Sequence, residues 1–295
     1  MISGVLVLDK PPGPTSHDMV AVARRALGER RIGHCGTLDP MATGVLALAV
    51  GQATRLVQFL SSEEKHYDAV VAFGRETNTY DVTGVTVAES PDRPTPAALA
   101  AALAQFRGTF AQRPPAYSAK KIGGIRAYHL ARREDGATLD LKPVTVTVAR
   151  LELLDFDGDR ATLAMQVSAG FYVRSLAHDL GQALGMGATL ASLRRTRAGA
   201  FGLEDAVTVE TVATSSAAVL ADRMIPLSRL LPELPSLALP PAEAACARRG
   251  MDLPLPGDWA EAPALSRLLD DHGHLLALAT PAKRPGFLHP AVVLG

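Results

Sequence analysis

The sequence has few cysteines, few aromatic residues and no excess of charge of either sign. Its 295 residues include 2 cysteines and 1 tryptophan, and aromatic residues make up 5%. Cys35 and Cys246 lie far apart and belong to no metal-spaced or redox pair. This pattern excludes a disulfide-stapled domain and fits a protein of a reducing cytosol.

Long apolar runs are also missing. The longest, residues 45–60, is broken by glycine, glutamine and arginine, which argues against a membrane span. The first ten residues contain no basic stretch followed by a long apolar one, so they do not predict a signal peptide. We therefore expect a cytoplasmic protein that makes no membrane contact.

The formal net charge is zero, which argues against indiscriminate nucleic-acid binding. The basic residues are nevertheless clustered, and arginine outnumbers lysine. The clusters are Arg24-Arg25, Arg30-Arg31, Lys120-Lys121, Arg132-Arg133, Arg194-Arg195 with Arg197, Arg248-Arg249 and Lys283-Arg284. Taken alone, such runs indicate a solvated surface, although local contact with a polyanion would use the same residues.

The length predicts one large domain and one small one. Prolines crowd residues 226–241, where we predict the boundary, with domains over residues 1–229 and 230–295. Strands are expected at 4–9, 45–50, 66–73, 144–153, 161–167, 275–279 and 291–294, and helices at 17–27, 54–60, 96–106, 175–184, 207–212 and 243–249. Strands and helices mix without a βαβ rhythm, so we expect an α+β fold around a mixed or antiparallel sheet.

Two polar features sit at predicted element ends. Ser16 is a plausible N-cap for the helix over residues 17–27. The acidic and histidine-rich segment 270–274 resembles a metal tract, but its glycine favours a polar turn between two strands.

The most distinctive segment is residues 33–44, GHCGTLDPMATG. It holds one carboxylate, Asp39, in a loop of glycine, threonine and proline directly before an apolar run. Glycine permits turn conformations, and Pro40 restricts the backbone of Asp39 to extended or turn geometry. An aspartate before proline can be a simple turn residue, or a carboxylate held in place for chemistry.

Other segments favour the chemical interpretation. In chain order they are GVL with DKP (residues 4–11), KHY (65–67), TNTYD (77–81), PPAYSA (114–119), GFYVR (170–174) and LRR (193–195). Together with residues 33–44 they closely resemble the TruB family, the bacterial tRNA pseudouridine synthases that act on uridine 55 of the T-loop. The resemblance covers roughly residues 3–230.

The resemblance implies that Asp39 is the catalytic carboxylate. The reaction breaks the N-glycosidic bond of uridine, turns the uracil and rejoins it through C5, with no net redox change and no cofactor. A carboxylate can attack the sugar as a nucleophile or take a proton from C2′ on the way to a glycal, and the sequence leaves both routes open. Cys35 is not expected to be the nucleophile, because no activating base stands beside it in the motifs.

Four further residues are implied to surround the target base. Tyr67 would lie against the uracil and relay a proton, and Leu193 would pack on its other face. Arg174 would pair with Asp39, since a guanidinium can hold a carboxylate through two hydrogen bonds. Tyr172 would pack near the base and orient this pair, pointing to the same side as Arg174 if the segment is extended. Taken alone, each could equally be a core or surface side chain.

Three residues are implied to act on the RNA or on the active-site loops. His34 would enter the RNA loop and help hold the target base out of its stack. Lys10 and Lys121 would contact phosphate or order the active-site loops. No metal is expected, because His34 has no second ligand at suitable spacing apart from the adjacent Cys35.

The resemblance thus implies a catalytic domain followed by a small, β-rich, PUA-like RNA-binding domain. The protein would bind the tRNA T-arm as a monomer without a protein partner. Three alternatives remain: a non-catalytic RNA-binding or RNA-folding protein, a guide-RNA-dependent synthase of the same fold, and a nucleoside hydrolase that releases free uracil.

Overall fold

The computed structural model describes residues 2–117, 121–122, 125–126, 141–257, 259 and 261–294. Of residues 121–122 and 125–126 only the strand backbone is described. Lys121 falls there, in β8 (Lys121–Ile122), so its side chain lies outside the described residues.

One mixed sheet organises the N-terminal part of the chain. It has 11 strands, and its main path runs β14-β1-β3-β12-β4-β11-β10-β7. These strands are β1 (Gly4–Lys10), β3 (Thr43–Val50), β4 (Lys65–Phe73), β7 (Gly108–Gln112), β10 (Val144–Phe156), β11 (Arg160–Val167), β12 (Ala188–Ala198) and β14 (Val207–Thr208). Most neighbours on this path are antiparallel, but β1–β14 and β3–β12 are parallel. The predicted α+β class with a mixed sheet is confirmed.

Short strands and two small hairpins complete this part. β2 (Ile32–His34) pairs with β3, β13 (Phe201–Gly202) with β12 and β15 (Ile225–Pro226) with β1. β5 (Arg75–Thr77) and β6 (Thr86–Glu89) form one hairpin, and β8 pairs with β9 (Ile125–Arg126) in the other.

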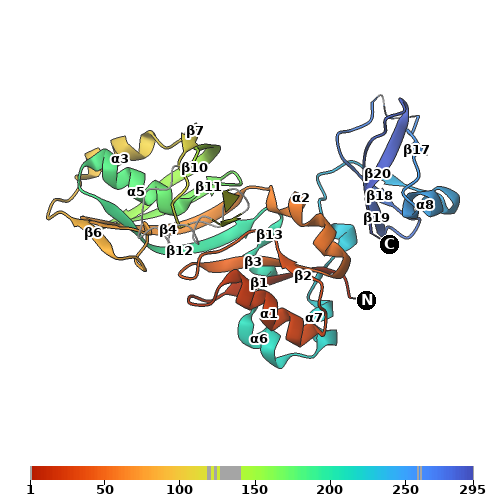
Figure 1. Ribbon diagram of the computed structural model, residues 1–295, viewed down its shortest axis with the longest axis horizontal. Coiled ribbons are helices and arrows are strands. Elements are labelled where there is room, and N and C mark those ends of the chain that lie inside the picture. Colours follow the sequence, from red (N-terminus) through yellow and green to blue (C-terminus); the bar gives the residue numbers. More distant parts are fainter. Residues whose placement is uncertain are drawn as a thin grey trace.

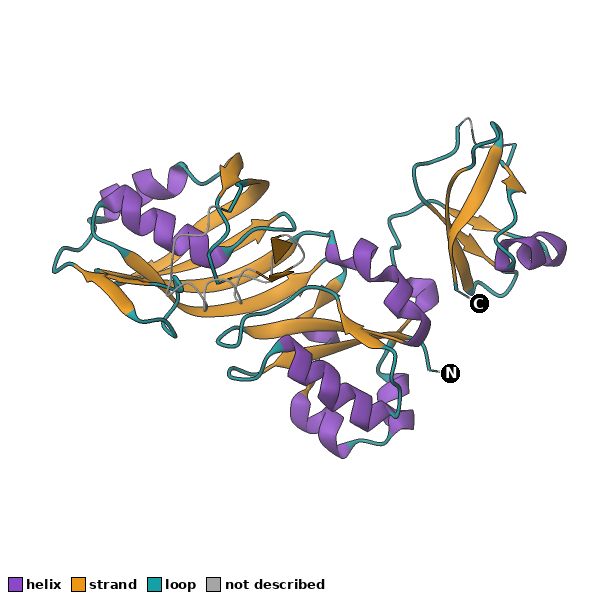
Figure 2. Cartoon of the chain, in the orientation of Figure 1, coloured by secondary structure: helices purple, strands orange, loops and turns teal. Residues whose placement is uncertain are grey.

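Helices cover the sheet at its two ends (Figure 1). α3 (Pro96–Ala104) and α5 (Val173–Leu184) pack together, with α5 against β12 and β4 and α3 against β10. α1 (Ser16–Leu27), α6 (Val209–Thr214) and α7 (Ala217–Asp222) pack together near β1. Figure 2 shows the long strands running between these two groups of helices. None of the helices in the described ranges has the length and apolarity needed to span a membrane.

The C-terminal part forms a separate small sheet, order β16-β18-β19-β20-β17, beside α8 (Pro241–Arg248). Its strands are β16 (Ser236–Ala238), β17 (Leu253–Pro254), β18 (Ser266–Leu269), β19 (Leu275–Pro281) and β20 (Phe287–Val293). It has a core of its own, which includes Leu268 and Leu288. In Figure 1 it stands apart from the large sheet, in blue. The predicted small β-rich domain is present, whereas its boundary at residue 230 stays a prediction.

The two parts share one apolar contact region. A buried cluster on the large sheet, including Val5 and Ala47, continues through Leu230 and Leu231 in the connecting segment. The same cluster reaches Leu278 of β19. Apolar contacts therefore tether the small sheet to the large-sheet part of the chain, in addition to the chain connection.

Three predicted helices differ from the structure in their cap, their type or their first residue. Thr15, not Ser16, caps α1, because Asp18 completes a capping box with Thr15 while the Ser16 hydroxyl is buried against Leu38. The helix predicted at 54–60 is a 3₁₀ turn (η1, Gly51–Leu56) followed by α2 (Val57–Ser61). The helix predicted at 207–212 begins later, because Val207 and Thr208 pair with β1 as β14.

Two misjudged elements matter for the site. The sequence did not predict β12, whose segment ATLASLRRTRA lacks a clean apolar alternation. α5 begins at Val173, two residues before the predicted start, so Arg174 lies in its first turn. The segment is therefore not extended, and the condition under which strand alternation would orient Tyr172 and Arg174 to one side is not met. The predicted polar turn at 270–274 is confirmed, since it joins β18 to β19 and Asp270 accepts the backbone N–H groups of His272 and His274.

Candidate active site

The loop between β2 and β3 carries Asp39 to the edge of a cleft of about 520 Å³. Gly44, at the start of β3, makes this approach possible: its φ is +98°, and a Cβ there would lie 2.2 Å from the Arg195 carbonyl oxygen on β12. Only glycine suits that position without strain. The loop is thereby drawn against β12.

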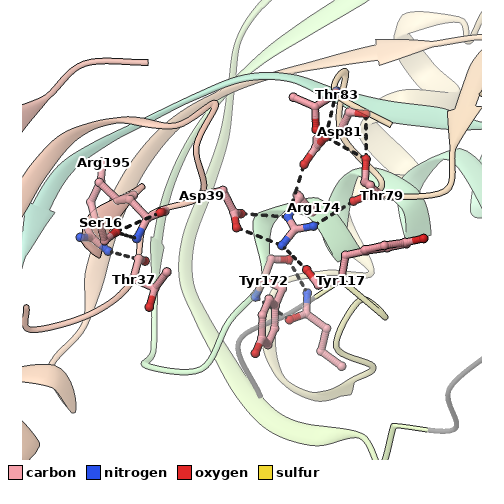
Figure 3. A network of polar contacts seen from close by, with 12 residues as sticks. Ser16, Thr37, Asp39, Thr79, Asp81, Thr83, Tyr117, Tyr172, Arg174 and Arg195 are labelled. Atoms are coloured by element: carbon pink, nitrogen blue, oxygen red, sulfur yellow. Dashed lines mark hydrogen bonds and ion pairs between the residues drawn. The ribbon is translucent and has the colours of Figure 1, made fainter. Parts of the chain in front are cut away.

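Asp39 and Arg174 form a bidentate ion pair (Figure 3). The Arg174 Nε donates to Oδ2 at 2.9 Å, and Nη2 donates to Oδ1 at 3.1 Å. This fork geometry fixes both the direction and the rotation of the carboxylate. The Asp39 side chain keeps 32% of its exposure, so it is held in place and still open to the cleft.

Groups other than Asp39 hold Arg174 in place. Its side chain is 6% exposed, and it donates to the carbonyl oxygens of Thr79 at 3.0 Å and Tyr117 at 2.9 Å. A second carboxylate, Asp81, lies 3.7 Å from Arg174 Nε and is itself 6% exposed. Two carboxylates and two carbonyls thus surround one buried guanidinium.

Asp81 is held by its own loop. Its Oδ1 accepts from the Thr79 hydroxyl at 2.8 Å, and from the Thr83 hydroxyl and backbone N–H at 2.6 and 2.9 Å. These bonds leave Oδ2 directed at Arg174, as Figure 3 shows.

The cleft wall combines apolar and aromatic side chains with polar ones. Tyr67 on β4, Leu193 on β12 and Tyr172 just before α5 line it together with Asp39 and Arg174. The backbone of Tyr172 is held on both sides by Gln112, whose amide oxygen accepts its N–H at 2.8 Å and whose amide nitrogen donates to its carbonyl at 3.0 Å. The cleft is thus lined by five of the predicted site residues, which come from four separated segments of the chain.

A buried arginine holds the Asp39 loop from the side of the sheet. Arg195 is 1% exposed, and its guanidinium donates to the carbonyls of Val45 at 2.7 Å, Gly36 at 3.1 Å and Thr37 at 3.3 Å. Arg195 is therefore not available for phosphate, so the interpretation of its basic cluster as an RNA contact can hold only for the partly exposed Arg194 and Arg197.

Lys10 has the same kind of role. It is fully buried, and its Nζ donates to the carbonyls of Pro11, Pro40 and Ala42 at 2.9, 3.1 and 2.8 Å. Of the two functions predicted for it, ordering a loop fits these contacts and binding phosphate does not. Burial lowers the pKa of Lys10 to about 8.

Lys65 lines the cleft as well. Its Nζ donates to the backbone carbonyls of Ser61 and Glu63. Burial, followed by the nearby Arg195, lowers its pKa to about 8. Burial also raises the pKa of the Cys35 thiol to about 12, so a thiolate does not form there at neutral pH.

His34 lies outside this cleft. It ends β2, opposite Leu48 of β3, and is partly exposed. It is absent from the residues described as lining the pocket. Its predicted contact with an opened RNA loop stays a prediction, as do the chemical roles of the cleft residues.

Comparison with known proteins agrees with this arrangement. Residues 24–173 match the TruB family pseudouridylate synthase N-terminal domain, and residues 174–232 match the tRNA pseudouridylate synthase B C-terminal domain. The chain belongs to the TruB family of pseudouridylate synthases.

Similar relatives span nearly the whole sequence. A tRNA pseudouridine synthase B of Solibacter usitatus is 44% identical over 99% of this chain and 100% of the relative. One from Bradyrhizobium diazoefficiens is 41% identical over 94% of this chain and 82% of the relative. Among solved structures, Cbf5 in an archaeal box H/ACA sRNP Nop10–Cbf5 complex gives a TM-score of 0.75 at 28% identity, covering 99% of this chain and 86% of that one.

The sequence pointed to the segments of the site but missed several supporting side chains. Asp81 and Gln112 had no predicted role, and Arg195 was considered only as a member of a basic cluster. Asp81 and Arg195 lie in quoted motifs, so their position was a usable signal. Gln112 belongs to none, and only the packing of β7 against the start of α5 reveals its function.

Proposed function

We propose that this protein is a tRNA pseudouridine synthase that isomerises uridine 55 of the T-loop and uses Asp39 as its catalytic carboxylate. One observation carries the proposal: the bidentate Asp39–Arg174 pair stands at a cleft that Tyr67 and Leu193 also line. Pure RNA binding needs no such fixed carboxylate. The relatives that match nearly the whole chain are tRNA pseudouridine synthases, which supports tRNA as the substrate.

In this proposal the target uridine leaves its stack and enters the cleft, where Tyr67 and Leu193 contact its two faces. Arg174 holds the Asp39 carboxylate toward the sugar. Attack on C1′ and proton abstraction from C2′ both begin with this carboxylate, and both release the uracil to rotate and rejoin through C5. Tyr67 relays the proton lost from C5.

The remaining parts of the proposal concern the RNA and the cell. The C-terminal sheet is a PUA-like module that binds the T-arm with the exposed arginine clusters, through phosphate contacts. His34 contacts the opened loop, and Lys121 contacts phosphate or orders the active-site loops. The enzyme acts in the cytoplasm as a monomer.

A guide-dependent synthase is the second candidate, because the Cbf5 chain of an H/ACA complex shares the whole fold. Identity favours the stand-alone enzyme: it is 44% to the Solibacter synthase against 28% to Cbf5.

The test is tritium release from a tRNA transcript carrying 5-tritiated uridine, with protein alone and no guide RNA, followed by nucleoside analysis. Wild type should release tritium and form pseudouridine at position 55. Asp39→Asn should retain tRNA binding and lose the reaction by roughly 10³-fold or more. Free uracil as the product would support a hydrolase, and binding without release would support the guide-dependent or RNA-folding alternatives.

A further inference from the structure

The backbone behind the candidate active site contains a strained residue. Tyr80 has a φ of +64°, and among the described residues Leu231 is the other non-glycine residue with positive φ. Left-handed conformations are unfavourable for side chains with a Cβ and persist only where the surroundings enforce them. Tyr80 lies between Thr79, whose carbonyl accepts from Arg174, and Asp81, which faces the same guanidinium.

An aromatic stack accompanies this conformation. The Tyr80 ring lies on the imidazole of His178, with centroids 3.9 Å apart and an interplanar angle of 12°. His178 is four residues after Arg174 on α5, so both side chains leave the same face of the helix. The stack therefore joins the loop that holds Arg174 to the helix that carries it.

Both partners of the stack are anchored. The Tyr80 carbonyl accepts the Leu190 N–H at 2.9 Å, which ties the loop to β12. The Nδ1 of His178 lies within ion-pair distance of Oε1 of Glu76, at 3.2 Å, although it makes no hydrogen bond there. The other Glu76 oxygen accepts from Gln182 at 2.9 Å. Neither ring is among the described residues that line the cleft.

We propose that Tyr80 and His178 are positioning residues, whose stack holds the Thr79 carbonyl and the Asp81 carboxylate against Arg174 and so fixes the direction of Asp39. The proposal rests on the function proposed above. If the stack is lost, the backbone at Tyr80 is free to leave φ +64°, the flanking carbonyl rotates away from Arg174, and the carboxylate loses its fixed direction.

Matched variants separate the stack from the backbone requirement. Tyr80→Gly accepts the positive φ without strain but has no ring, while Tyr80→Phe and His178→Phe keep a ring at each position. In single-turnover assays at saturating tRNA, Tyr80→Gly and His178→Ala should react roughly 10- to 100-fold more slowly, because small misplacements of reacting groups cost this much. The two phenylalanine variants should stay within about 3-fold of wild type. Dissociation constants for tRNA should be unchanged in all four.

A second measurement, by NMR, does not depend on enzymatic activity. The side-chain Nε–H of Arg174 donates to Asp39 within a buried pair, so protein with ¹⁵N-labelled arginine should give a slowly exchanging Nε–H signal, assigned with Arg174→Lys. Tyr80→Gly and His178→Ala should broaden or shift this signal, whereas Tyr80→Phe should leave it as in wild type. If wild type makes no pseudouridine, the proposed function fails while this signal still tests the stack.

Two results would overturn the inference. One is a Tyr80→Gly protein with wild-type rate and an unchanged Arg174 signal, which would mean that the position needs only a left-handed backbone. The other is a Tyr80→Phe protein as slow as Tyr80→Gly, which would assign the effect to the hydroxyl. If Tyr80→Gly does not fold, His178→Ala against His178→Phe gives the same comparison with the Tyr80 backbone intact.

Discussion

Two bidentate arginine–aspartate pairs with similar hydrogen-bond distances lie in different surroundings within the described part of this chain. Arg174 meets Asp39 at 2.9 and 3.1 Å, and Arg194 meets Asp9 at 3.1 and 2.8 Å. The Arg174 side chain is 6% exposed, whereas that of Arg194 is 41% exposed. Hydrogen-bond distances therefore do not distinguish a candidate catalytic pair from a surface pair.

The difference lies in what fixes each arginine. Two backbone carbonyls and the carboxylate of Asp81 hold Arg174, so its guanidinium cannot turn away from Asp39. For Arg194, the further contact described is a long one, 3.5 Å to the Thr43 hydroxyl. An ion pair becomes preorganised when it is buried and when its arginine also bonds to groups other than its partner carboxylate.

The largest expected effect comes from breaking the buried pair. Arg174→Ala leaves the Asp81 carboxylate, 6% exposed, without its cation. We expect the free energy of unfolding to fall by about 3–5 kcal/mol and pseudouridine formation to be lost. Urea unfolding measures the loss of stability, and the tritium assay measures the loss of activity. A loss of stability below about 1 kcal/mol would show that the buried guanidinium does not stabilise the fold.

The next effect concerns the arginine under the Asp39 loop. Arg195→Met keeps an unbranched chain but removes the donors to the carbonyls of Val45, Gly36 and Thr37. We expect a loss of about 1–3 kcal/mol in unfolding free energy, since buried carbonyls lose their partners. Activity should fall without a matching loss of tRNA affinity, because the loop that carries Asp39 loosens. Equal losses in rate and affinity would contradict this.

A third effect appears only as a dependence on pH. Burial lowers the pKa of Lys10 from 10.5 to about 8. Between these values the unfolded chain still holds a proton that the folded protein has released, so stability due to Lys10 rises with pH. The difference in unfolding free energy, wild type minus Lys10→Met, should be flat below pH 8 and grow up to about pH 10.

The comparison with Lys10→Met isolates one group, since Lys65 and Cys35 titrate alike in both proteins. Cys35 acts in the opposite sense, because its raised pKa keeps a proton on the folded protein and makes stability fall at high pH. A difference that shrinks between pH 8 and 10 would contradict the assignment to Lys10.

The smallest effect is expected at the exposed pair. Arg194→Ala should change the free energy of unfolding by no more than about 1 kcal/mol, as exposed ion pairs contribute little. Asp39 chemistry should continue at close to the wild-type rate once tRNA is saturating. A collapse of the rate comparable to that of Arg174→Ala would remove the distinction between the two pairs.

The sequence predicted much of this fold from local signals. Apolar and alternating runs gave β1, β3, β4, β10 and β11 within a few residues. It missed β12 at the middle of the sheet, because Arg195 and its neighbours interrupt the apolar pattern. Arg195 faces the interior because it donates to three carbonyls that lie about 150 residues earlier in the chain. A pattern read from neighbouring residues cannot reveal such partners.

For the site, the motifs selected residues but could not say how they act together. Asp39 and Arg174 were paired by family resemblance, yet the helical start of α5, the Asp81 carboxylate and the Gln112 clamp on Tyr172 were not foreseen. The sequence left phosphate binding and loop ordering open for Lys10, and its burial favours loop ordering.

The sequence by itself determined the class of fold, the family and the identity of the candidate carboxylate, because those depend on residue types and their order. Only the tertiary structure decided which charges are buried, which arginine is fixed by further partners and which backbone is strained. Those properties arise from contacts between segments far apart in the chain, and free energies of burial and hydrogen bonding depend on such contacts rather than on neighbours in sequence.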